Sequence, residues 1–384
     1  MDNLLLSSSN SPTFSVPSTS STKVILVRHG RTTYNEQGRY QGNSDKSILT
    51  PKGHQDAYAT GLALQQYNFD AIYTSPLKRV RQTTQEILTA LKDRDYVPSV
   101  YSDRLLNEIC MFHWQGLSYQ EVKGKFAQDY SCWQNTPHLF SLNNVSPVLE
   151  LFEKAKLFWH KVLTEHRGQT ILIVAHGGTN RALISMAVGL KPENYHSLQL
   201  SNCGISCLEF DSSNSFGKLQ YLNDTYHLGK TLPKLKAGKT GWRWLLLSET
   251  NAQNLIDRPL LNELCSSNID LLLTEISISK FLIQKLSANY QLSHLFLTEK
   301  HFTNWQQIII GRQKLSISAE QLRLTTGLII APDKLIARIL QQTFQVNISH
   351  TENVLTIIHY PHGKNLSILQ GILPLTVNKV VLSK

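Results

Sequence analysis

The sequence is poor in the residues that build disulfide scaffolds and membrane spans. Its 384 residues include five cysteines, which form no CxxC pair and no run with the spacing of metal ligands: Cys110, Cys132, Cys203, Cys207 and Cys265. An odd, scattered set of this kind indicates reduced thiols in a cytoplasmic protein. No apolar stretch approaches about 18 uninterrupted residues, so no membrane-spanning helix is expected.

The N-terminal segment lacks basic residues. Residues 1–22 contain no Lys or Arg, so the basic n-region of a secretory signal is missing. Serine, threonine and proline dominate the segment, and such a composition cannot bury a core. We therefore expect a disordered tail over residues 1–22, with a targeting role as the alternative.

Acidic residues are scarce in the second half of the chain. Residues 229–384 carry 17 Lys/Arg against 9 Asp/Glu, whereas residues 23–228 carry 21 against 18. The net charge of +10 therefore belongs mainly to the second half. No motif of interleaved aromatic and basic residues accompanies this excess, so a nucleic-acid partner is not expected. The length of the chain predicts two domains.

What the chain does contain is a short apolar run that ends in charged residues. In KVILVRHGRTTYNEQGRYQG (residues 23–42), Val24 to Val27 predict a buried strand, and Arg28, His29 and Gly30 follow it directly. In open α/β sheets, ligands bind at the carboxyl ends of the strands. The pattern places a nucleophile or base, with a fixed cation, at that edge.

Strands alternate with helices through the first half. Thr50 before Pro51 is a helix N-cap, residues 70–74 predict a strand, and a helix runs from the Ser-Pro pair at 75 to about Leu91. Residues 97–101 predict another strand, and residues 118–166 look helical. This alternation predicts an α/β fold with a mostly parallel central sheet between two helical layers, a three-layer sandwich.

A second strand, Thr170 to Ala175, ends in His176-Gly177 and enters a helix. A single histidine at a strand end is more often a structural residue than a catalytic one. Two strands that end in His-Gly in one βαβ chain predict that His29 and His176 face each other at one sheet edge.

Two further groups could join the histidines. Arg79 lies in the first turn of a helix, where its guanidinium could lean over the sheet edge and bind an anion. The alternative for Lys78, Arg79 and Arg81 is a solvated helix face. Glu108 lies among aromatic residues, which favours a raised pKa and a general acid. The alternative for Glu108 is an exposed loop glutamate.

Four segments together resemble the motifs of the histidine phosphatase superfamily, also called the phosphoglycerate mutase-like family. They are LVRHGRTTYNEQGRYQG, SPLKRVRQT, NEICMFHWQG and AHGGTNRALI, and the resemblance covers residues 23–228. It implies a phosphoglycerate mutase-like fold and a reaction through a phosphohistidine, with no metal and no cofactor.

The resemblance also assigns roles to residues. It implies that His29 is the nucleophile, that Arg28, Arg79 and His176 bind the phosphoryl oxygens, and that Glu108 protonates the leaving oxygen. It further implies that Asn35 touches the phosphoryl group and that Gln41, Gly42 and Gly177 line the substrate pocket. Cations and N–H donors suit a phosphoryl group, whose charge spreads over its oxygens during transfer. Repulsion from Arg28 and Arg79 is expected to keep His29 neutral.

Two departures from the family pattern leave substrate preference open. Arg31 stands where the family more often has glutamate, which adds positive charge beside the nucleophile. The family's Pro-Gly-Gly-Glu-Ser stretch appears only as residues 147–151, PVLEL. The short loop after Glu108 and the ending at residues 226–229, YHLG, resemble the phosphatase branch and its metal-independent phosphoserine phosphatases.

The second half contains a basic segment and a faint repeat. Residues 229–243 carry five basic residues and no acid, which predicts a solvated linker, with anion binding as the alternative. Beyond it, segments starting at 244, 268, 327 and 353 can be laid in order over those at 24, 68, 171 and 203. In that alignment Ser248 and Glu249 replace Arg28 and His29, while Ser279 replaces Arg79 and Pro332 replaces His176. Residues 244–384 are thus expected to form a second, smaller α/β domain, a degenerate copy without chemistry.

These observations predict a phosphomonoester hydrolase acting on a small phosphorylated metabolite, with phosphoserine as the leading candidate. Two alternatives remain open: a 2,3-bisphosphoglycerate-dependent phosphoglycerate mutase, and a regulatory protein that binds phosphorylated ligands without catalysis. A homodimer is left open, and no membrane partner is expected.

Overall fold

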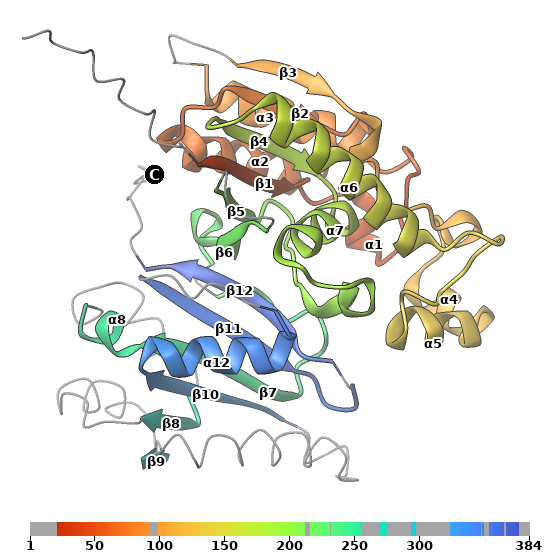
Figure 1. Ribbon diagram of the computed structural model, residues 1–384. Helices are drawn as coiled ribbons and strands as arrows, with labels where there is room; N and C mark the ends of the chain where they lie inside the picture. The colour runs from red at the N-terminus through yellow and green to blue at the C-terminus, as the bar shows by residue number, and fades with distance from the viewer. Residues whose placement is uncertain are drawn as a thin grey trace, which may run out of the picture.

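The computed structural model describes residues 21–92, 98–211, 216–230, 232–254, 269–274, 293–296, 323–346, 348, 353–364 and 366–375 (Figure 1). Residues 1–20 of the expected tail lie outside this set, as do Cys265, Ser279 and the start of the strand expected at 97. The first strand begins at Thr22, so the last residue of the expected tail is part of the sheet.

The first half alternates strands and helices as expected. Its strands are β1 (Thr22–Arg28), β2 (Ala71–Thr74), β3 (Ser99–Ser102), β4 (Thr170–Ala175), β5 (Ile205–Phe210) and β6 (Lys218–Asp224). Its helices are α1 (Thr33–Gln37), α2 (Pro51–Ala63), α3 (Lys78–Ala90), α4 (Tyr119–Lys125), α5 (Ala127–Asn135), α6 (Pro147–Glu165) and α7 (Gly177–Val188). Short 3-10 turns are η1 (Leu64–Gln66), η2 (Arg104–Leu106), η3 (Phe112–Trp114), η4 (Pro192–Ser197) and η5 (Tyr226–Leu228).

Local sequence explains where these helices begin and end. The Thr50 side chain accepts a hydrogen bond from the N–H of Gly53, and Pro51 occupies the first turn of α2. The helical stretch expected over 118–166 is instead three helices, because the chain turns at residues 136–146 before α6 starts at Pro147. Ser118 caps α4 through a capping box with Glu121.

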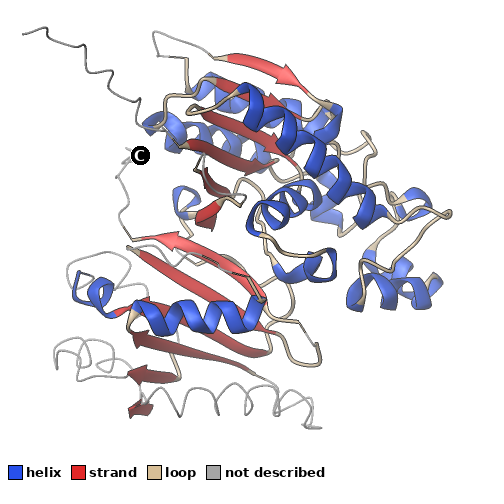
Figure 2. Cartoon of the chain, viewed as in Figure 1, coloured by secondary structure: helices blue, strands red, loops and turns tan. Residues whose placement is uncertain are grey.

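Alternate residues of the first sheet face two different helical layers. Val24, Leu26 and Ile173 pack in a cluster with α6 and α7, whereas Ile25 and Val174 pack in another with α3. Strands with both faces buried in this way read as continuous apolar runs. Figure 2 shows the strands lying between the helices. The predicted α/β class and three-layer arrangement are confirmed, with strands β1, β4, β2 and β3 parallel to one another.

The second half is a smaller α/β region. Its described elements are β7 (Gly241–Ser248), α8 (Glu249–Asn254), β8 (Leu271–Thr274), β9 (Ser293–Phe296), β10 (Leu324–Ala331), α12 (Asp333–Phe344), β11 (Val354–Tyr360) and β12 (Ile368–Pro374). The last residues of the expected linker, 241–243, already belong to β7.

The strand order of the second half repeats that of the first. Over the described residues the sheet runs β3-β2-β4-β1-β5-β6-β12-β11-β7-β10-β8-β9, so each half has the same connectivity read outward from the centre. The register agrees too, because Arg28 pairs with Ala175 at the end of β1 just as Ser248 pairs with Ala331 at the end of β7. The same two strand ends are laid over each other in the sequence alignment of the two halves, where Ser248 replaces Arg28 and Pro332 replaces His176. The descent of the second half from a phosphatase domain stays a prediction.

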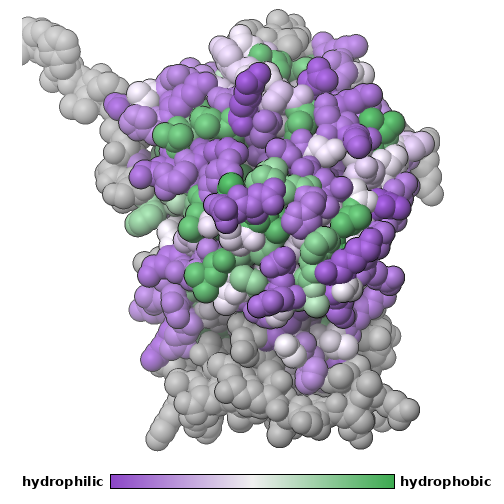
Figure 3. Space-filling model, turned by 90° about the vertical axis from the view of Figure 1, so that its right-hand side faces the viewer, coloured by the Kyte–Doolittle hydropathy of each residue, from purple (hydrophilic) through white to green (hydrophobic). Residues whose placement is uncertain are grey.

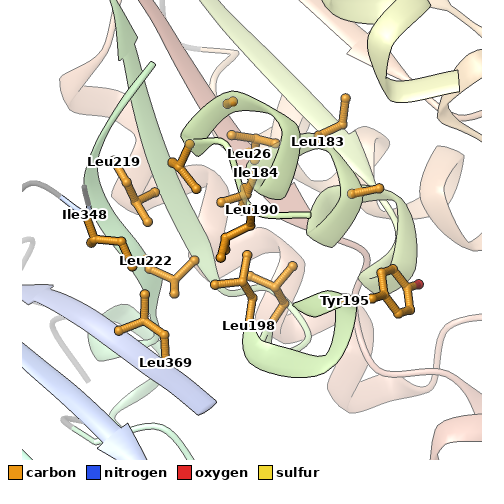
Figure 4. Packing of buried hydrophobic residues seen from close by; sticks show 14 of the residues in the cluster. Leu26, Leu183, Ile184, Leu190, Tyr195, Leu198, Leu219, Leu222, Ile348 and Leu369 are labelled. Atoms are coloured by element: carbon orange, nitrogen blue, oxygen red, sulfur yellow. The ribbon is translucent and has the colours of Figure 1, made fainter. Parts of the chain in front are cut away.

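The two halves meet through their last strands. β6 pairs antiparallel with β12 at Leu222 and Ile372. Leu222, Leu369 and Leu198 lie together in the apolar packing seen in Figure 4, which includes side chains from both halves. The halves therefore share a continuous sheet and a hydrophobic cluster.

The face of the molecule drawn in Figure 3 has no broad apolar patch among its described residues. On the face in Figure 3, hydrophobic residues form small groups among hydrophilic ones. None of the helices in the described part of the chain has the length and hydrophobicity needed to cross a membrane. The four described cysteines are free thiols.

Candidate active site

The two histidines meet because their strands are neighbours. β1 and β4 run parallel, and the His29 N–H donates to the carbonyl oxygen of Ala175 at 2.9 Å. The imidazole centroids of His29 and His176 lie 5.3 Å apart. His29 is 2% exposed and His176 is fully buried. The structure thus brings together the pair that the sequence pattern predicted.

Hydrogen bonds define which ring nitrogens are free. His29 Nδ1 lies 2.8 Å from the carbonyl oxygen of Gly30, which can only accept, so Nδ1 carries the proton and Nε2 keeps its lone pair. His176 Nε2 lies 2.8 Å from Ser75 Oγ, and this hydroxyl in turn donates to Asn107 Oδ1. His176 Nε2 therefore carries the proton, and its Nδ1 has no partner among the described residues.

Both arginines are anchored through their terminal nitrogens. Arg28 Nη1 donates to the carbonyl oxygen of Leu200 at 2.9 Å. Arg79 is fully buried and donates from Nη1 to the carbonyl oxygen of Ser44 at 2.7 Å and from Nη2 to that of Gly42 at 2.8 Å. The Nε atoms of both arginines are buried and have no partner in the described structure. The solvated alternative is therefore wrong for Arg79, although it holds for the exposed Lys78 and Arg81.

Burial and positive charge keep His29 neutral. Desolvation lowers the pKa of His29 well below its usual value, and Arg79 and Arg28 lower it further. The pKa of His176 is lowered by the same two kinds of cause, desolvation first and then Arg79. Desolvation also lowers the pKa of Arg79 to about 10, which still leaves the guanidinium charged at neutral pH. The expected repulsion is present, and desolvation outweighs it.

Glu108 lies at the N-terminus of α7. Its Oε1 accepts from the N–H groups of Ile109 at 2.9 Å and Thr179 at 3.2 Å, and its Oε2 accepts from that of Gly178 at 3.0 Å. Free N–H groups of a helix start are natural partners for a carboxylate. Of the aromatic residues expected around Glu108, Trp114 is fully buried and packs on Phe140.

Two glycines of α7 permit the close packing of this site. A Cβ at Gly177 would come within 3.0 Å of Arg28 Nε. A Cβ at Gly178 would come within 2.2 Å of Glu108 Oε1 and 2.6 Å of the Tyr195 hydroxyl, closer than such contacts occur. The His-Gly-Gly sequence thus leaves room for a guanidinium and a carboxylate side by side.

The loop after His29 holds three of the predicted substrate residues. Asn35 forms a capping box with Thr32 at the start of α1, and Thr32 Oγ1 also donates to Gln41 Oε1 at 3.0 Å. Gly42 has a φ of +52° and offers its carbonyl oxygen to Arg79. Asn35, Gln41 and Gly42 shape the loop beside the histidines, and their contact with substrate stays a prediction.

Three side chains that support the site escaped sequence reasoning. Asn202 Nδ2 donates to the carbonyl oxygens of His29 at 3.0 Å and Gly30 at 3.2 Å, and Thr83 Oγ1 accepts from the Gly30 N–H at 2.9 Å. Ser75, which orients His176, could have been found from its place at the end of a strand, like both histidines. Asn202 and Thr83 carry no such local signal, because they reach the site only through the fold.

Arg31 was expected to add positive charge beside His29, but its side chain points to a different partner. Its side chain is 48% exposed and forms an ion pair with Glu36 at 3.3 Å. The cations that lower the pKa of His29 are Arg79, Arg28 and Lys236, of which the last belongs to the segment expected as a linker. In the described part of the chain, no group of three or more His, Cys, Asp and Glu side chains could hold a metal ion.

Comparisons with known proteins point in one direction. The sequence model of the histidine phosphatase superfamily (branch 1) matches residues 24–225. The 2-carboxy-D-arabinitol-1-phosphatase of Triticum aestivum is 43% identical over 188 residues, covering 49% of this chain and 37% of that protein. Phosphoserine phosphatase 1 of Hydrogenobacter thermophilus is 30% identical over 208 residues, covering 54% of this chain and 95% of that protein.

Solved structures agree with the sequence matches. Bacillus stearothermophilus YhfR is 26% identical with a TM-score of 0.50, and the match covers 54% of this chain and 99% of that one. The chain spans only about two fifths of the length of the wheat protein (37%) and of a probable 2-carboxy-D-arabinitol-1-phosphatase of Arabidopsis thaliana (42%). The similarity to these proteins is therefore concentrated in the half that contains His29 and His176.

Proposed function

Because the chain belongs to the histidine phosphatase superfamily (branch 1), we propose that it is a phosphomonoester hydrolase that works through a phosphohistidine at His29. One observation carries the proposal most directly. Around a neutral histidine with a free Nε2, three buried nitrogens lack partners among the described residues: Arg28 Nε, Arg79 Nε and His176 Nδ1. Buried polar atoms are normally satisfied. Phosphoryl oxygens would satisfy all three.

In the first step, His29 Nε2 attacks phosphorus, a P–N bond forms, and the bond to the leaving oxygen breaks. The guanidinium groups of Arg28 and Arg79 stabilise the charge on the phosphoryl oxygens. A bound phosphoryl dianion favours the protonated form of His176, whose Nδ1–H then donates to a phosphoryl oxygen. The anchored Nη atoms fix both guanidinium groups before substrate arrives, so little reorganisation is required.

Glu108 supplies and recovers the proton. Among the described residues its Oε2 accepts one backbone N–H, from Gly178, so this oxygen has room to carry a proton for the leaving alkoxide. In the second step the ionised carboxylate takes a proton from water, which attacks the phosphohistidine. Inorganic phosphate leaves, and His29 and Glu108 return to their starting states.

The proposed substrate is a small phosphorylated metabolite, with phosphoserine as the first candidate. Phosphoserine is named in the description of the Hydrogenobacter relative, and the wheat relative is described as acting on carboxyarabinitol 1-phosphate. A phosphoglycerate mutase of Cytophaga hutchinsonii, 31% identical over 206 residues, supports the mutase alternative. The short loop after Glu108 favours hydrolysis.

We propose further that residues 244–384 form a non-catalytic copy behind a linker at 229–243, after a phosphatase domain at 23–228. At the strand ends that correspond to His29 and His176 stand Glu249 and Pro332. Neither residue can form a phosphohistidine. The full chain would therefore contain a single catalytic site.

The test is hydrolysis of an aryl phosphate by the full chain and by His29→Ala. We expect the variant to lose at least about 1,000-fold in kcat, as removal of a nucleophile typically does. His160→Ala replaces an exposed histidine on α6 and should keep wild-type activity. Equal rates for wild type and His29→Ala would refute catalysis and leave the ligand-binding alternative.

Two further measurements separate the remaining alternatives. Quenching in alkaline detergent should trap a phosphoenzyme that later acid treatment hydrolyses, and a label on any residue other than His29 would contradict the assignment. Adding a phosphoglycerate acceptor should leave the release of inorganic phosphate as the main reaction, whereas phosphoryl transfer to the acceptor would favour a mutase. A chelator is expected to leave hydrolysis unchanged.

A further inference from the structure

A lysine from the segment after the phosphatase half lies against the candidate active site. Lys236 Nζ donates to the carbonyl oxygen of Leu200, the same atom that accepts Arg28 Nη1. Lys236 lies beyond residues 24–225, the part of the chain that the family model matches. Its ammonium therefore reaches the site from outside the part of the chain that the family model matches.

The backbone around Lys236 is fixed by a buried glutamine. Gln199 Nε2 donates to the carbonyl oxygen of Lys234 at 2.8 Å, and the Lys236 N–H donates to Gln199 Oε1 at 3.3 Å. Gln199 is 5% exposed. These two hydrogen bonds hold the backbone of residues 234–236 beside Gln199, and the Lys236 side chain extends from there to the Leu200 carbonyl oxygen next to Arg28.

The second half of the molecule fixes the same segment from the other side. The Gln199 N–H donates to the carbonyl oxygen of Leu369 at 3.0 Å, and Gln370 Nε2 donates to that of Pro233 at 2.8 Å. Leu369 and Gln370 both belong to β12. The second half thus positions Lys236 although it lacks catalytic residues of its own.

The ammonium of Lys236 lies among other cations and has no carboxylate partner within the described residues. As a whole residue it is exposed, whereas its ammonium end lies close to other cations. Desolvation lowers its pKa well below the usual value, and Arg28 and Arg181 lower it further. Among the described residues, neither Lys236 nor these two arginines form an ion pair with a carboxylate. An anion from solution would relieve this repulsion.

The phosphoryl group does not require Lys236. Arg28 Nη1, which shares the Leu200 oxygen with Lys236, lies on the edge of the guanidinium opposite to Nε–H. The unpaired Nε is on the edge that would bind the phosphoryl oxygens, together with Arg79 Nε and His176 Nδ1. Lys236 is therefore placed to meet a second anionic group on the substrate.

We propose that Lys236 determines substrate specificity by binding a carboxylate on the part of the substrate that departs with the leaving oxygen. The preferred substrates are then phosphorylated acids. This inference rests on the proposed function, since it assigns a second anion site beside the phosphoryl site.

The test compares ligands that differ in a carboxylate. The pairs are phosphoserine with phosphoethanolamine, and 3-phosphoglycerate with glycerol 3-phosphate. Each is measured as a competitive inhibitor of aryl phosphate hydrolysis by the full chain, by Lys236→Met and by Lys236→Arg. The methionine keeps an unbranched side chain and removes the charge. Lys234→Met is the matched control, because Lys234 is exposed on the same segment and offers Gln199 only its backbone oxygen.

In Lys236→Met we expect the inhibition constants of the two carboxylated ligands to rise roughly 10- to 100-fold, the usual effect of a lost charged hydrogen bond. The ligands without a carboxylate should change less than about twofold, and Lys236→Arg and Lys234→Met should keep the wild-type preference. An equal change for both members of each pair, or no change, overturns the proposal.

Failure of the proposed function would be recognised separately. If the wild type does not hydrolyse the aryl phosphate, hydrolysis is refuted. The same four ligands are then titrated by calorimetry into the wild type and Lys236→Met. A carboxylate preference that Lys236→Met loses supports the specificity inference, and a preference that it retains, or that the wild type lacks, overturns it.

Discussion

At the scale of single residues, the state of His29 follows from one hydrogen bond and from burial. The bond from Nδ1 to the Gly30 carbonyl oxygen leaves Nε2 as the free nitrogen, and desolvation keeps the ring neutral. Asn202 steadies that same carbonyl oxygen. Glu108 is also held by a few hydrogen bonds, because two N–H groups at the start of α7 donate to its carboxylate. Small changes in these contacts should therefore have large effects on rate.

Gly178→Ala should separate the role of Glu108 from that of His29. The new Cβ would come within 2.2 Å of Glu108 Oε1, so the carboxylate must move from the start of α7. We expect kcat for an alkyl phosphate to fall roughly 100-fold, the lower end of what general acid catalysis contributes. An aryl phosphate, whose leaving group needs less protonation, should lose much less. Steady-state kinetics on both substrates measures the difference.

The control for this variant is Gly124→Ala. Gly124 is a helical glycine with no heavy atom within 4 Å of an added Cβ. It should keep wild-type rates on both substrates. An equal loss on alkyl and aryl phosphates in Gly178→Ala would mean that Glu108 is not the proton donor.

At the scale of elements, Asn223 joins β6 to two neighbours. Its Oδ1 accepts from the Ser201 N–H at 2.6 Å, and its Nδ2 donates to the carbonyl oxygen of Gln370 at 2.9 Å. The residue is fully buried and has a φ of +58°, a conformation that asparagine tolerates better than most residues. It thereby ties the loop beside Asn202 to β12 of the second half.

Asn223→Ala should destabilise the protein by about 3 kcal/mol or more. The change leaves the Ser201 N–H and the Gln370 carbonyl oxygen without partners, and each unsatisfied buried group costs about 1–3 kcal/mol. Denaturant unfolding measures the loss. Asn143→Ala is the control, because Asn143 is exposed with a φ of +51° and thus carries the same backbone strain at the surface. A similar loss of unfolding free energy in both variants would show that backbone strain, and not the lost hydrogen bonds, destabilises Asn223→Ala.

At the scale of the whole molecule, burial keeps several of the described histidines neutral. Desolvation lowers the pKa of His29 and His176 well below the usual value, that of His196 to about 3 and that of His227 to about 4. In the unfolded chain these groups take up a proton near pH 6.5. Below that pH the unfolded state binds more protons than the folded state, so stability is lost as the pH falls.

The free energy of unfolding should fall by up to about 1.4 kcal/mol per pH unit for each such histidine between pH 6.5 and 5. His227→Asn removes one of them and should make the dependence shallower by about that amount. His160→Asn, a change at an exposed position, should keep the wild-type dependence. Unfolding curves recorded at pH 7.5, 6.5, 5.8 and 5 provide the comparison. A His227→Asn slope equal to that of the wild type would contradict the prediction.

Local sequence predicted strands β1 to β4, the Thr50 cap of α2 and the meeting of the two histidines, because these depend on short-range pattern. Arg79 could not be assigned from pattern alone, since a lysine and an arginine beside it are solvated and only the fold buries it. The partners of Glu108 at the start of α7 could not be predicted, because Gly178 lies 70 residues away in sequence. Lys236 looked like part of a solvated connector for the same reason. Its neighbours Gln199 and Arg28 are distant in sequence.

The pairing of β6 with β12 also has a consequence for how the protein avoids aggregation. A strand at the edge of a sheet offers unpaired backbone groups to any other chain. In this molecule β12 pairs with β6 at that edge of the first half's sheet, and Leu369 lies in one apolar cluster with Leu222 and Leu198. A chain cut after Gly229 would keep every proposed catalytic residue and yet expose this edge to other copies. The second half thus shields the last strand of the first half from other chains.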